Sequence, residues 1–511
     1  MKTANSDIRT DYLTGAPNLR PFYQYPLQNP DFRAIIEAKA KEDIDRQLLS
    51  RVISEQYAGL PEVPAVSENI ERLSSPNTFT VTTGHQLALF GGPLFTTYKV
   101  LSTARLAADL KAQFPEYQFV PVFWIHTEDH DFEEINHFYS AFNQKHTYPG
   151  KFAGAVGEHV LETSIKSLVP SRFHGTLAAA FSPGKPLKDA YREFMHSLFA
   201  PYGVVMLDAS DPRLKARFRE VMRAEVNAGV AQKEVSRVSE LLEELGYPAQ
   251  ITARDINLFY SDENGRDRIT KNGQEYEVVG RNLQFSPEAL NDIIENHPEK
   301  ISPNVSLRPL YQEMILPNLA YFGGWGEIAY WFQLKGVFDH FGVNYPLILP
   351  RMSATIFTRD VWQTWKDLGF PPSEIGKPMH ELYRQFMPNI WDETTFRQIS
   401  EEIIAKILAM KSYIEAEVSP TLPRSVEGQK VKMERFVANL EKKIHRVKRA
   451  DNAAIFSRIE SAKLAIQPEG LVQERILSLA AFPDATPEKI IAAAWEACSP
   501  LDFTHRYLVL D

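Results

Sequence analysis

The first half of the chain alternates short apolar segments with longer amphipathic ones. β-Branched residues over 78–83 and an apolar run over 119–125 predict two strands, and residues 94–114 between them predict a helix. Further strands are predicted at 203–208 and 345–349. Strands that are apolar nearly throughout and are separated by helices are typical of a parallel sheet covered on both faces. The pattern therefore predicts an open α/β sheet.

Breaks in this pattern divide the first two thirds of the chain. Residues 1–75 predict helices that pack on the core, including an amphipathic helix over 32–57. Residues 76–355 predict the α/β core with inserted segments. One insertion, near 256–280, has short β-branched stretches around the turn pair Asn272-Gly273, which favours a β-hairpin outside the main sheet.

The last third of the chain predicts helices. Residues 356–395 predict a helical connector, 396–470 an antiparallel coiled coil, and 471–511 a segment that returns to the core. Prolines in the stretch 419–423 are expected to separate the two long helices. The apolar positions predicted to form the seam are Phe396, Ile399, Ile403, Ile407, Met410, Ile414 and Val418, and then Met433, Phe436, Leu440, Ile444 and Val447. The basic stretch 430–449 is interpreted as a solvated helix face.

Composition narrows the class of protein. The 511 residues include 56 Lys and Arg against 65 Asp and Glu, a formal net charge of −9. This balance argues against a dedicated binder of nucleic acid or of an anionic membrane. A single cysteine excludes an intrachain disulfide and a Cys-rich zinc site, and it suits a reducing compartment. No signal-peptide pattern and no long apolar span are present, so we expect a cytoplasmic protein with no membrane or nucleic-acid partner.

A glycine-rich turn joins the first predicted strand to the next helix. Its residues of interest are Gly84, His85, Gln86, Gly91 and Gly92, and Lys99 follows two turns into the helix. Free amides at a helix start attract anions, and a lysine side chain leans back toward that end. We expect this turn to bind phosphate or another anionic group. The alternative is a turn that only caps a core helix.

Four ionisable residues follow the second predicted strand: Glu128, Asp129, His130 and Asp131. Ligands of open α/β sheets bind beyond the carboxyl ends of the strands. Crowded carboxylates favour a bound cation, such as an ammonium group, and His130 is a candidate proton acceptor. Two alternatives stay open: an acidic helix N-terminus, and a divalent metal held with His126. We expect no tightly bound metal, because no third, distant ligand stands out.

Two further segments suggest contact with a ligand. Arg308 lies among apolar residues, where its planar fork suits a substrate carboxylate or an ion pair within the fold. Gly323 and Gly324 lie beside aromatic residues and precede a helix that starts near Glu327. Glycines in this position allow the backbone to approach a ligand.

These motifs resemble, in the same order and over nearly the whole chain, those of the cysteine ligase family of bacillithiol biosynthesis (BshC). The matching blocks are 83–99, 122–132, 304–331 with Arg308, Tyr311 and Glu327, and 471–475. The resemblance implies a Rossmann-like core, similar to the nucleotidyl-transferase fold, with inserted connecting segments and a C-terminal coiled coil. It also implies a homodimer formed through the coiled coil. The implied reaction adds cysteine to glucosaminyl malate, the last step of bacillithiol biosynthesis.

The resemblance also implies roles for residues. In the nucleotidyl-transferase fold, a His-rich turn after the first strand and a Lys-Met-Ser loop after the last bind ATP phosphates. Gly84-His85 and Arg351-Met352-Ser353 take the corresponding places, so ATP with Mg²⁺ is implied. Malate carboxylates need cationic hosts such as Lys99, Arg308 or Arg351, and an ammonium group needs anionic hosts within 128–131. The alternatives are a metal-dependent hydrolase that uses the Glu-Asp-His-Asp cluster and a non-catalytic coiled-coil scaffold.

Overall fold

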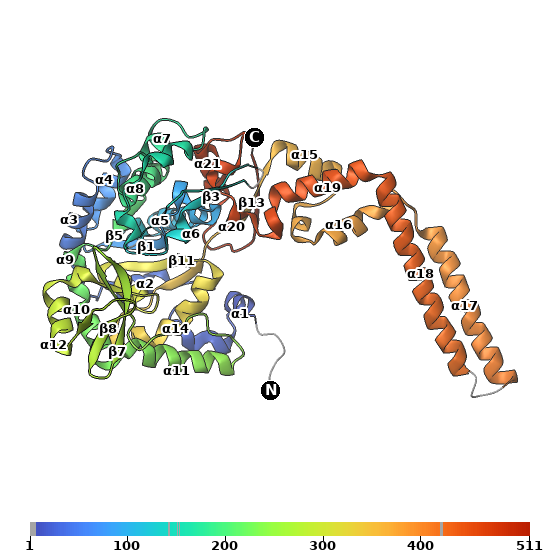
Figure 1. The fold of residues 1–511 in the computed structure, drawn as a ribbon, viewed down its shortest axis with the longest axis horizontal. Coiled ribbons are helices and arrows are strands. Elements are labelled where there is room, and N and C mark those ends of the chain that lie inside the picture. Colours follow the sequence, from blue (N-terminus) through green and yellow to red (C-terminus); the bar gives the residue numbers. More distant parts are fainter. Residues whose placement is uncertain (1–6, 142–143, 151, 153, 419–422, 511) are drawn as a thin grey trace. The chain divides into compact units, whose positions relative to one another are not determined.

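The structure is a computed structural model that describes residues 7–141, 144–150, 152, 154–418 and 423–510 (Figure 1). These residues form two compact units. One contains the chain up to Ile356 together with Gln473–Leu510, and the other contains Phe357–Val472. Positions 419–422 of the predicted interhelical loop lie outside the described residues.

A five-stranded parallel sheet forms the centre of the first unit. Its strands run in the order β12-β11-β1-β2-β5. Their bounds are β1 Thr78–His85, β2 Gln118–Ile125, β5 Val205–Asp208, β11 Asn318–Gly323 and β12 Leu347–Pro350. Helix α5 (Leu94–Gln113) connects β1 to β2, and the residues of all five strands are almost entirely buried. The predicted Rossmann-like α/β class is confirmed.

The strand order reverses beside β1. The chain adds β2 and β5 on one side of β1, and then returns to place β11 and β12 on the other side. All the strand pairs are parallel, so the five carboxyl ends lie along one edge of the sheet. Ligands of such sheets bind at this edge. Strand β11 was not predicted, because its six residues, Asn-Leu-Ala-Tyr-Phe-Gly, are short and lack β-branched side chains.

A second, antiparallel sheet is inserted between β5 and β11 of the chain. Its order is β10-β6-β7-β8-β9. The bounds are β6 Leu258–Asp262, β7 Gly265–Asn272, β8 Glu275–Val278, β9 Gln284–Phe285 and β10 Ile301–Pro303. Strands β7 and β8 form a hairpin at Asn272-Gly273, where Gly273 has a φ of 64°. The predicted hairpin region is thus part of a larger sheet, which also includes the strand that precedes α13.

Helices cover both sheets of this unit. They are α1 Ile8–Thr14, α2 Phe32–Lys39, α3 Arg46–Gln56, α4 Pro64–Arg72, α6 Phe132–Ile135, α7 Thr176–Ala180, α8 Leu187–Phe199, α9 Pro212–Lys215, α10 Arg219–Ala228, α11 Val230–Glu244, α12 Pro287–Asn296, α13 Arg308–Ile315, α14 Trp325–Phe341, α20 Gln473–Ile476 and α21 Pro487–Ala497. Two short strands, β3 His137–Tyr139 and β4 Lys145–Thr147, form a separate ribbon. The single helix predicted over 32–57 is wrong: the chain breaks after Lys39, and Asp45 caps a new helix by accepting the Leu48 N–H at 3.0 Å.

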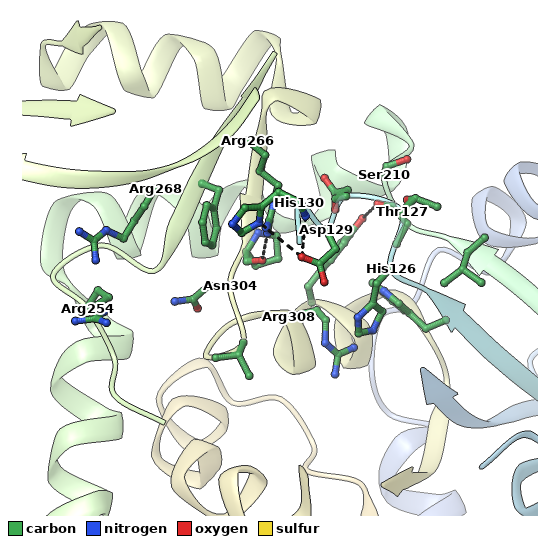
Figure 2. A pocket seen from close by; sticks show the side chains of 18 of the residues that line it. His126, Thr127, Asp129, His130, Ser210, Arg254, Arg266, Arg268, Asn304 and Arg308 are labelled. Atoms are coloured by element: carbon green, nitrogen blue, oxygen red, sulfur yellow. Dashed lines mark hydrogen bonds and ion pairs between the residues drawn. The ribbon is translucent and has the colours of Figure 1, made fainter. Parts of the chain in front are cut away.

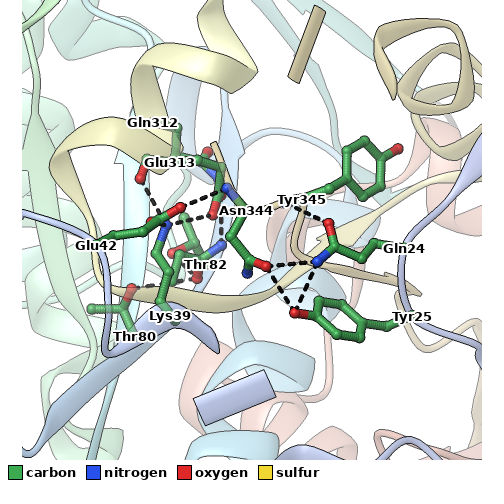
Figure 3. Close-up of polar contacts among 11 residues, drawn as sticks. Gln24, Tyr25, Lys39, Glu42, Thr80, Thr82, Gln312, Glu313, Asn344 and Tyr345 are labelled. Carbon is green, nitrogen blue, oxygen red and sulfur yellow. Dashed lines mark hydrogen bonds and ion pairs between the residues drawn. The ribbon is translucent and has the colours of Figure 1, made fainter. Parts of the chain in front are cut away.

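A buried polar network anchors α2 to the sheet (Figure 3). Lys39 is fully buried, and its Nζ donates to the Glu313 carbonyl at 2.8 Å and lies 2.5 Å from a Glu42 carboxylate oxygen. The Glu313 carboxylate accepts from the side-chain amides of Gln312 and Asn318. Asn318 in turn accepts the Thr82 hydroxyl hydrogen at 2.8 Å. The network therefore joins the N-terminal helices to the central strands β1 and β11.

This network should make stability depend on pH. Burial raises the pKa of Glu313 from 4.5 to about 7, although Lys39 opposes the shift. The folded protein thus keeps a proton that the unfolded chain releases, so stability should fall as the pH rises between these two values, by about 3 kcal/mol, and then level off. Hydrogen exchange of the β1 amides would measure this. Glu313→Gln should remove the dependence, and an unchanged pH profile in that variant would contradict the assignment.

The second unit is helical. It contains α15 Arg359–Asp367, α16 Met379–Phe386, α17 Thr394–Glu417, α18 Pro423–Asp451 and α19 Ala453–Ile466. Helices α17 and α18 pack against each other along their length. The predicted seam is partly wrong. The half-buried positions are Phe396, Ser400, Ile404, Ile407, Lys411 and Ile414 on α17, and Val426, Glu427, Lys430, Met433, Val437, Glu441, Ile444, His445 and Lys448 on α18.

A second apolar stripe on these helices is exposed. Its members are Ile399, Ile403, Met410 and Tyr413 on α17, and Phe436, Leu440 and Val447 on α18. Most of these exposed residues come one residue before a half-buried position of the same helix. In an antiparallel pair this offset turns both stripes toward the same side of the hairpin. The hairpin therefore presents one broad apolar face.

Candidate functional site

A cavity of about 550 Å³ lies beyond the carboxyl end of β2 (Figure 2). One wall is the segment Trp124–His130, and the facing wall comes from β6, β7 and the residues that follow β10. Five predicted candidates line the cavity: Glu128, Asp129, His130, Arg308 and Tyr311. It is also lined by residues that the sequence analysis did not single out, including Ser210, Arg254, Arg266, Arg268 and Asn304.

The two carboxylates of the cavity have different partners. Glu128 pairs with the fully buried Lys215, whose Nζ lies 2.7 Å from Oε2. Asp129 accepts the Gln86 side-chain amide at 2.7 Å and the His130 backbone N–H at 2.7 Å. Glu128 is thus neutralised by a lysine, whereas Asp129 is held by neutral donors. The negative charge of Asp129 can therefore still pair with a cationic group of a ligand.

His130 has a defined hydrogen-bonding role. Its Nδ1 lies 3.1 Å from an Arg266 guanidinium nitrogen. Arginine can only donate, so Nδ1 must accept, and the proton of the neutral imidazole is on Nε2. Arg266 is itself stacked on Phe259, 3.9 Å from the ring centroid, and donates to Ser302 at 2.8 Å. His130 therefore offers the ligand an N–H donor rather than the basic nitrogen predicted for it.

Asp131 does not belong to the cavity. It is exposed, and its carboxylate accepts the Glu134 N–H at 3.2 Å as the N-cap of the short helix α6. The alternative of an acidic helix N-terminus therefore applies to Asp131 but not to Glu128 or Asp129. The structure gives Asp131 a capping role and does not support its prediction as a catalytic residue.

His126 lies where β2 meets the glycine turn. A β-carbon on Gly84 would lie 3.0 Å from the His126 Nε2 and 3.1 Å from the Trp124 carbonyl oxygen, so only glycine leaves room for this ring. Burial, assisted by the charge of Arg308, lowers the pKa of His126 well below 6.5. His126 is therefore neutral at neutral pH, and its Nε2 is shielded with no hydrogen-bond partner among the described residues.

The two candidate residues on α13, Arg308 and Tyr311, differ in whether their side chains are free to bind a ligand. Arg308 donates to Gln312 at 3.1 Å, lies over the Trp124 ring, and keeps a second guanidinium nitrogen without a partner in the described part of the chain. It can therefore still bind a carboxylate. Tyr311 is fully buried and donates its hydroxyl hydrogen to the Ala209 carbonyl at 2.8 Å. Tyr311 thus supports the cavity wall.

The start of α5 is not open in the way that the predicted anion site requires. Gly91 and Gly92 have φ values of 86° and 70° and are buried against Phe194 and Ala88. The first amide of the helix, at Leu94, donates to the Leu477 carbonyl at 2.8 Å. The C-terminal segment thus occupies this helix start. The glycines turn the chain inside the core, as the alternative interpretation held.

Lys99 of α5 and Glu327 of α14 form an ion pair in which the lysine is buried and the glutamate is partly buried. The Lys99 Nζ lies 2.6 Å from a Glu327 carboxylate oxygen and donates to the Gly84 carbonyl at 3.0 Å. Burial disfavours the charged carboxylate, but Lys99 and the N–H of Gly324 outweigh this and lower the pKa of Glu327. Gly323 is closely packed against the Glu327 side chain. Lys99 is therefore not free to host a substrate carboxylate as predicted.

His85, Arg351 and Ser353 lie along the same sheet edge but outside the cavity lining. Burial and the charge of Lys99 lower the pKa of His85 to about 4, so this ring is neutral. Arg351 donates to Glu474 at 2.8 Å, and Ser353 donates to the same carboxylate at 3.0 Å. Glu474 is thus the partner of both Arg351 and Ser353, which were predicted to contact phosphate.

One residue of the glycine turn does reach the cavity segment. The Gln86 amide bridges Asp129 and Glu134, with both bonds at 2.7 Å. The turn after β1 and the acidic segment after β2 therefore meet, as parallel neighbours at a sheet edge should. The contact positions the Asp129 carboxylate, and the glycine turn itself does not line the cavity.

A metal site requires several ligand atoms close to one another. Among the described residues, a group of three His, Cys, Asp or Glu ligand atoms that lie within 4.8 Å of one another occurs at Glu393, Glu441 and His445, and no such group includes residues 126–131. The metal alternative for His126 and His130 therefore gains no support from three clustered ligand atoms in the described part of the chain. No helix in the described ranges is long and apolar enough to span a membrane.

Comparison with known proteins places the chain in a family. Residues 1–352 match the family described as "Bacillithiol biosynthesis BshC, N-terminal Rossmann-like domain", and residues 354–510 match its "C-terminal coiled-coil domain". A protein of Cytophaga hutchinsonii named "Putative cysteine ligase BshC" is 35% identical over 98% of this chain and 95% of its own length. A protein of Flavobacterium johnsoniae with the same name is 33% identical over 99% and 97%. The chain belongs to the BshC family.

Proposed function

We propose that the protein is a ligase that joins the carboxyl group of cysteine to the amino group of glucosaminyl malate, the last step of bacillithiol biosynthesis. The names of its relatives support a cysteine ligase. The observation that carries the proposal is the cavity. It brings Asp129 together with Arg254 and Arg268, whose guanidinium groups have no partner among the described residues, so one site can hold both the ammonium group and the carboxylates of the acceptor.

Asp129 is the residue best placed to receive the amine. A carboxylate attracts an ammonium group and can accept its proton before the nitrogen attacks an activated carboxyl. The Gln86 amide and the backbone N–H of His130 hold Asp129 in place, and Nε2–H of His130 can donate to a substrate oxygen. The thiol in the reaction is the substrate's, because Cys498 is buried and burial raises its pKa to about 11.

Amide formation from a free carboxylate needs an activating co-substrate, and we propose ATP with Mg²⁺ for this role. The predicted phosphate hosts do not fit it as they stand. Lys99 pairs with Glu327, Arg351 pairs with Glu474, and the start of α5 is covered by Leu477. Lys99 and Arg351 are thus not free for a phosphate at the turn after β1.

The reaction itself is directly testable. The full chain is incubated with cysteine, glucosaminyl malate, ATP and Mg²⁺, and mass spectrometry follows the conjugate. We expect a product that carries one cysteine per amino sugar and that requires all the components. If folded protein gives no conjugate under these conditions, the proposed ligase activity is wrong. The hydrolase alternative predicts release of a cleaved amino sugar instead, together with loss of activity after metal removal.

We further propose that the broad apolar face of the α17–α18 hairpin forms a homodimer. Ile403→Glu with Phe436→Glu should convert the dimer to a monomer, because a second copy would bury both side chains and a buried carboxylate is costly. Light scattering after gel filtration measures the mass. The matched control is Ala405→Glu with Ala438→Glu on the opposite side of the hairpin, which should stay dimeric. A wild-type monomer would contradict the proposal.

A further inference from the structure

The cavity contains more cationic groups than its carboxylates can balance. Four arginines line it, at positions 254, 266, 268 and 308, against Glu128 and Asp129. Lys215 already neutralises Glu128. The cavity is therefore positive although the whole chain carries a net charge of −9. A local field of this sign concentrates anionic ligands.

Two of the four arginines have structural partners. Arg266 donates to Ser302 and His130 and stacks on Phe259. Arg308 donates to Gln312 and lies over Trp124. These contacts explain why both residues are held where they are.

No such contacts explain the positions of the Arg254 and Arg268 side chains. Neither guanidinium group has a hydrogen-bond or ion-pair partner among the described residues. Figure 2 shows both toward one end of the cavity, away from His126 and Arg308, with Asn304 between them and Asp129. Two cations at one end repel each other unless a ligand carries the opposite charge.

The backbone under both residues is held firmly. The Asn257 side chain accepts the Arg254 N–H at 3.0 Å and donates to the Arg254 carbonyl at 2.8 Å. Asn257 is fully buried and is itself bonded to Glu225 at 2.7 Å. Arg268 lies within β7, opposite Phe259 of β6, and its carbonyl accepts the Val279 N–H. Both guanidinium groups thus extend from rigid supports, as a preorganised binding site requires.

We infer that Arg254 and Arg268 form a subsite for a dicarboxylate, each planar fork binding one carboxylate. Two forks from separate elements suit two separated planar anions better than one compact phosphate. This inference deepens the proposed function and rests on it in one respect, namely that the dicarboxylate is the malate part of the acceptor. Malate would then lie at the arginine end of the cavity, with the amino group toward Asp129.

Binding of malate alone tests the subsite without any reaction. Calorimetry with the full chain should show malate binding at least tenfold more tightly than lactate, which has one carboxylate. Arg254→Gln and Arg268→Gln should each weaken malate binding about tenfold or more, because each removes a charge-assisted bond. Lys271→Gln, an exposed change on the same strand, is the control and should bind malate like wild type.

Each outcome decides the assignment. Inorganic phosphate that binds more tightly than malate would overturn the dicarboxylate class, and unchanged malate affinity in both arginine variants would overturn the subsite. In the ligation assay the two variants should raise KM for glucosaminyl malate about tenfold or more and leave KM for cysteine unchanged. Malate binding without any ligation would refute the proposed function alone. Ligation with unaltered KM in the variants would refute the subsite alone.

Discussion

Replacing Asp129 with asparagine is expected to lower kcat for the proposed ligation by about 10²–10⁴-fold, the range typical of a lost general base. The variant keeps the shape of the side chain and an oxygen that can accept the His130 N–H, whereas the Gln86 amide, which donates to the other oxygen, loses that acceptor. It removes the negative charge that attracts the ammonium group and accepts its proton. Steady-state kinetics with glucosaminyl malate as the varied substrate would measure the loss.

Asp131→Asn provides a matched control two residues away. Asparagine caps a helix as well as aspartate does, so this variant should keep both its stability and its activity within about twofold. Equal losses in the two variants would mean that the negative charge of the whole segment matters rather than Asp129. Full activity in Asp129→Asn would remove Asp129 from the reaction.

Replacing Lys39 with methionine should cost about 3–5 kcal/mol of stability in the first unit, the range for breaking a buried ion pair by removing one partner. The change leaves Glu313 fully buried without a cation and its carbonyl without the Lys39 donor. The loss should be larger at pH 8 than at pH 5.5, because a protonated Glu313 needs no cation. Hydrogen exchange of the β1 and β11 amides reports the opening free energy.

Lys41→Met is the control for this experiment. Lys41 is exposed two residues further along the chain, so its loss should change stability by less than about 0.5 kcal/mol. Adding Glu313→Gln to Lys39→Met should restore part of the lost stability, since the uncompensated carboxylate is then gone. A double variant no more stable than Lys39→Met would show that the cost comes from the lost hydrogen bonds instead.

The sheet was predictable where local pattern and burial agree. Strands β1 and β2 are β-branched or continuously apolar, and α5 has the length and composition of a helix, so the βαβ unit was predicted within a few residues. Strand β11 is an inner strand of the sheet, yet only its pairing with β1 and β12 makes it a strand. The break between α2 and α3 depends on the Asp45 cap, which apolar spacing does not show.

The location of the cavity was predictable from the sequence, but several of the residues that line it were not. The acidic segment follows a buried strand, which is a local signal. The difference between Asp129 and Asp131 depends on Gln86, 43 residues away, and no local pattern contains it. Arg266 and Arg268 lie in the segment predicted as a β-hairpin outside the main sheet, and Arg254 lies just before it. Only the tertiary fold turns that segment toward the end of β2.

The absence of a side chain at Gly84 has a consequence for how this cavity can diverge among relatives. Any larger residue there would push the His126 ring away from the strand end, so the floor of the cavity tolerates little change. The opposite wall is an inserted antiparallel sheet whose hairpin tips can lengthen or shorten without disturbing the parallel core. Changes in acceptor preference during evolution should therefore accumulate in the inserted sheet, while the strand ends stay constant.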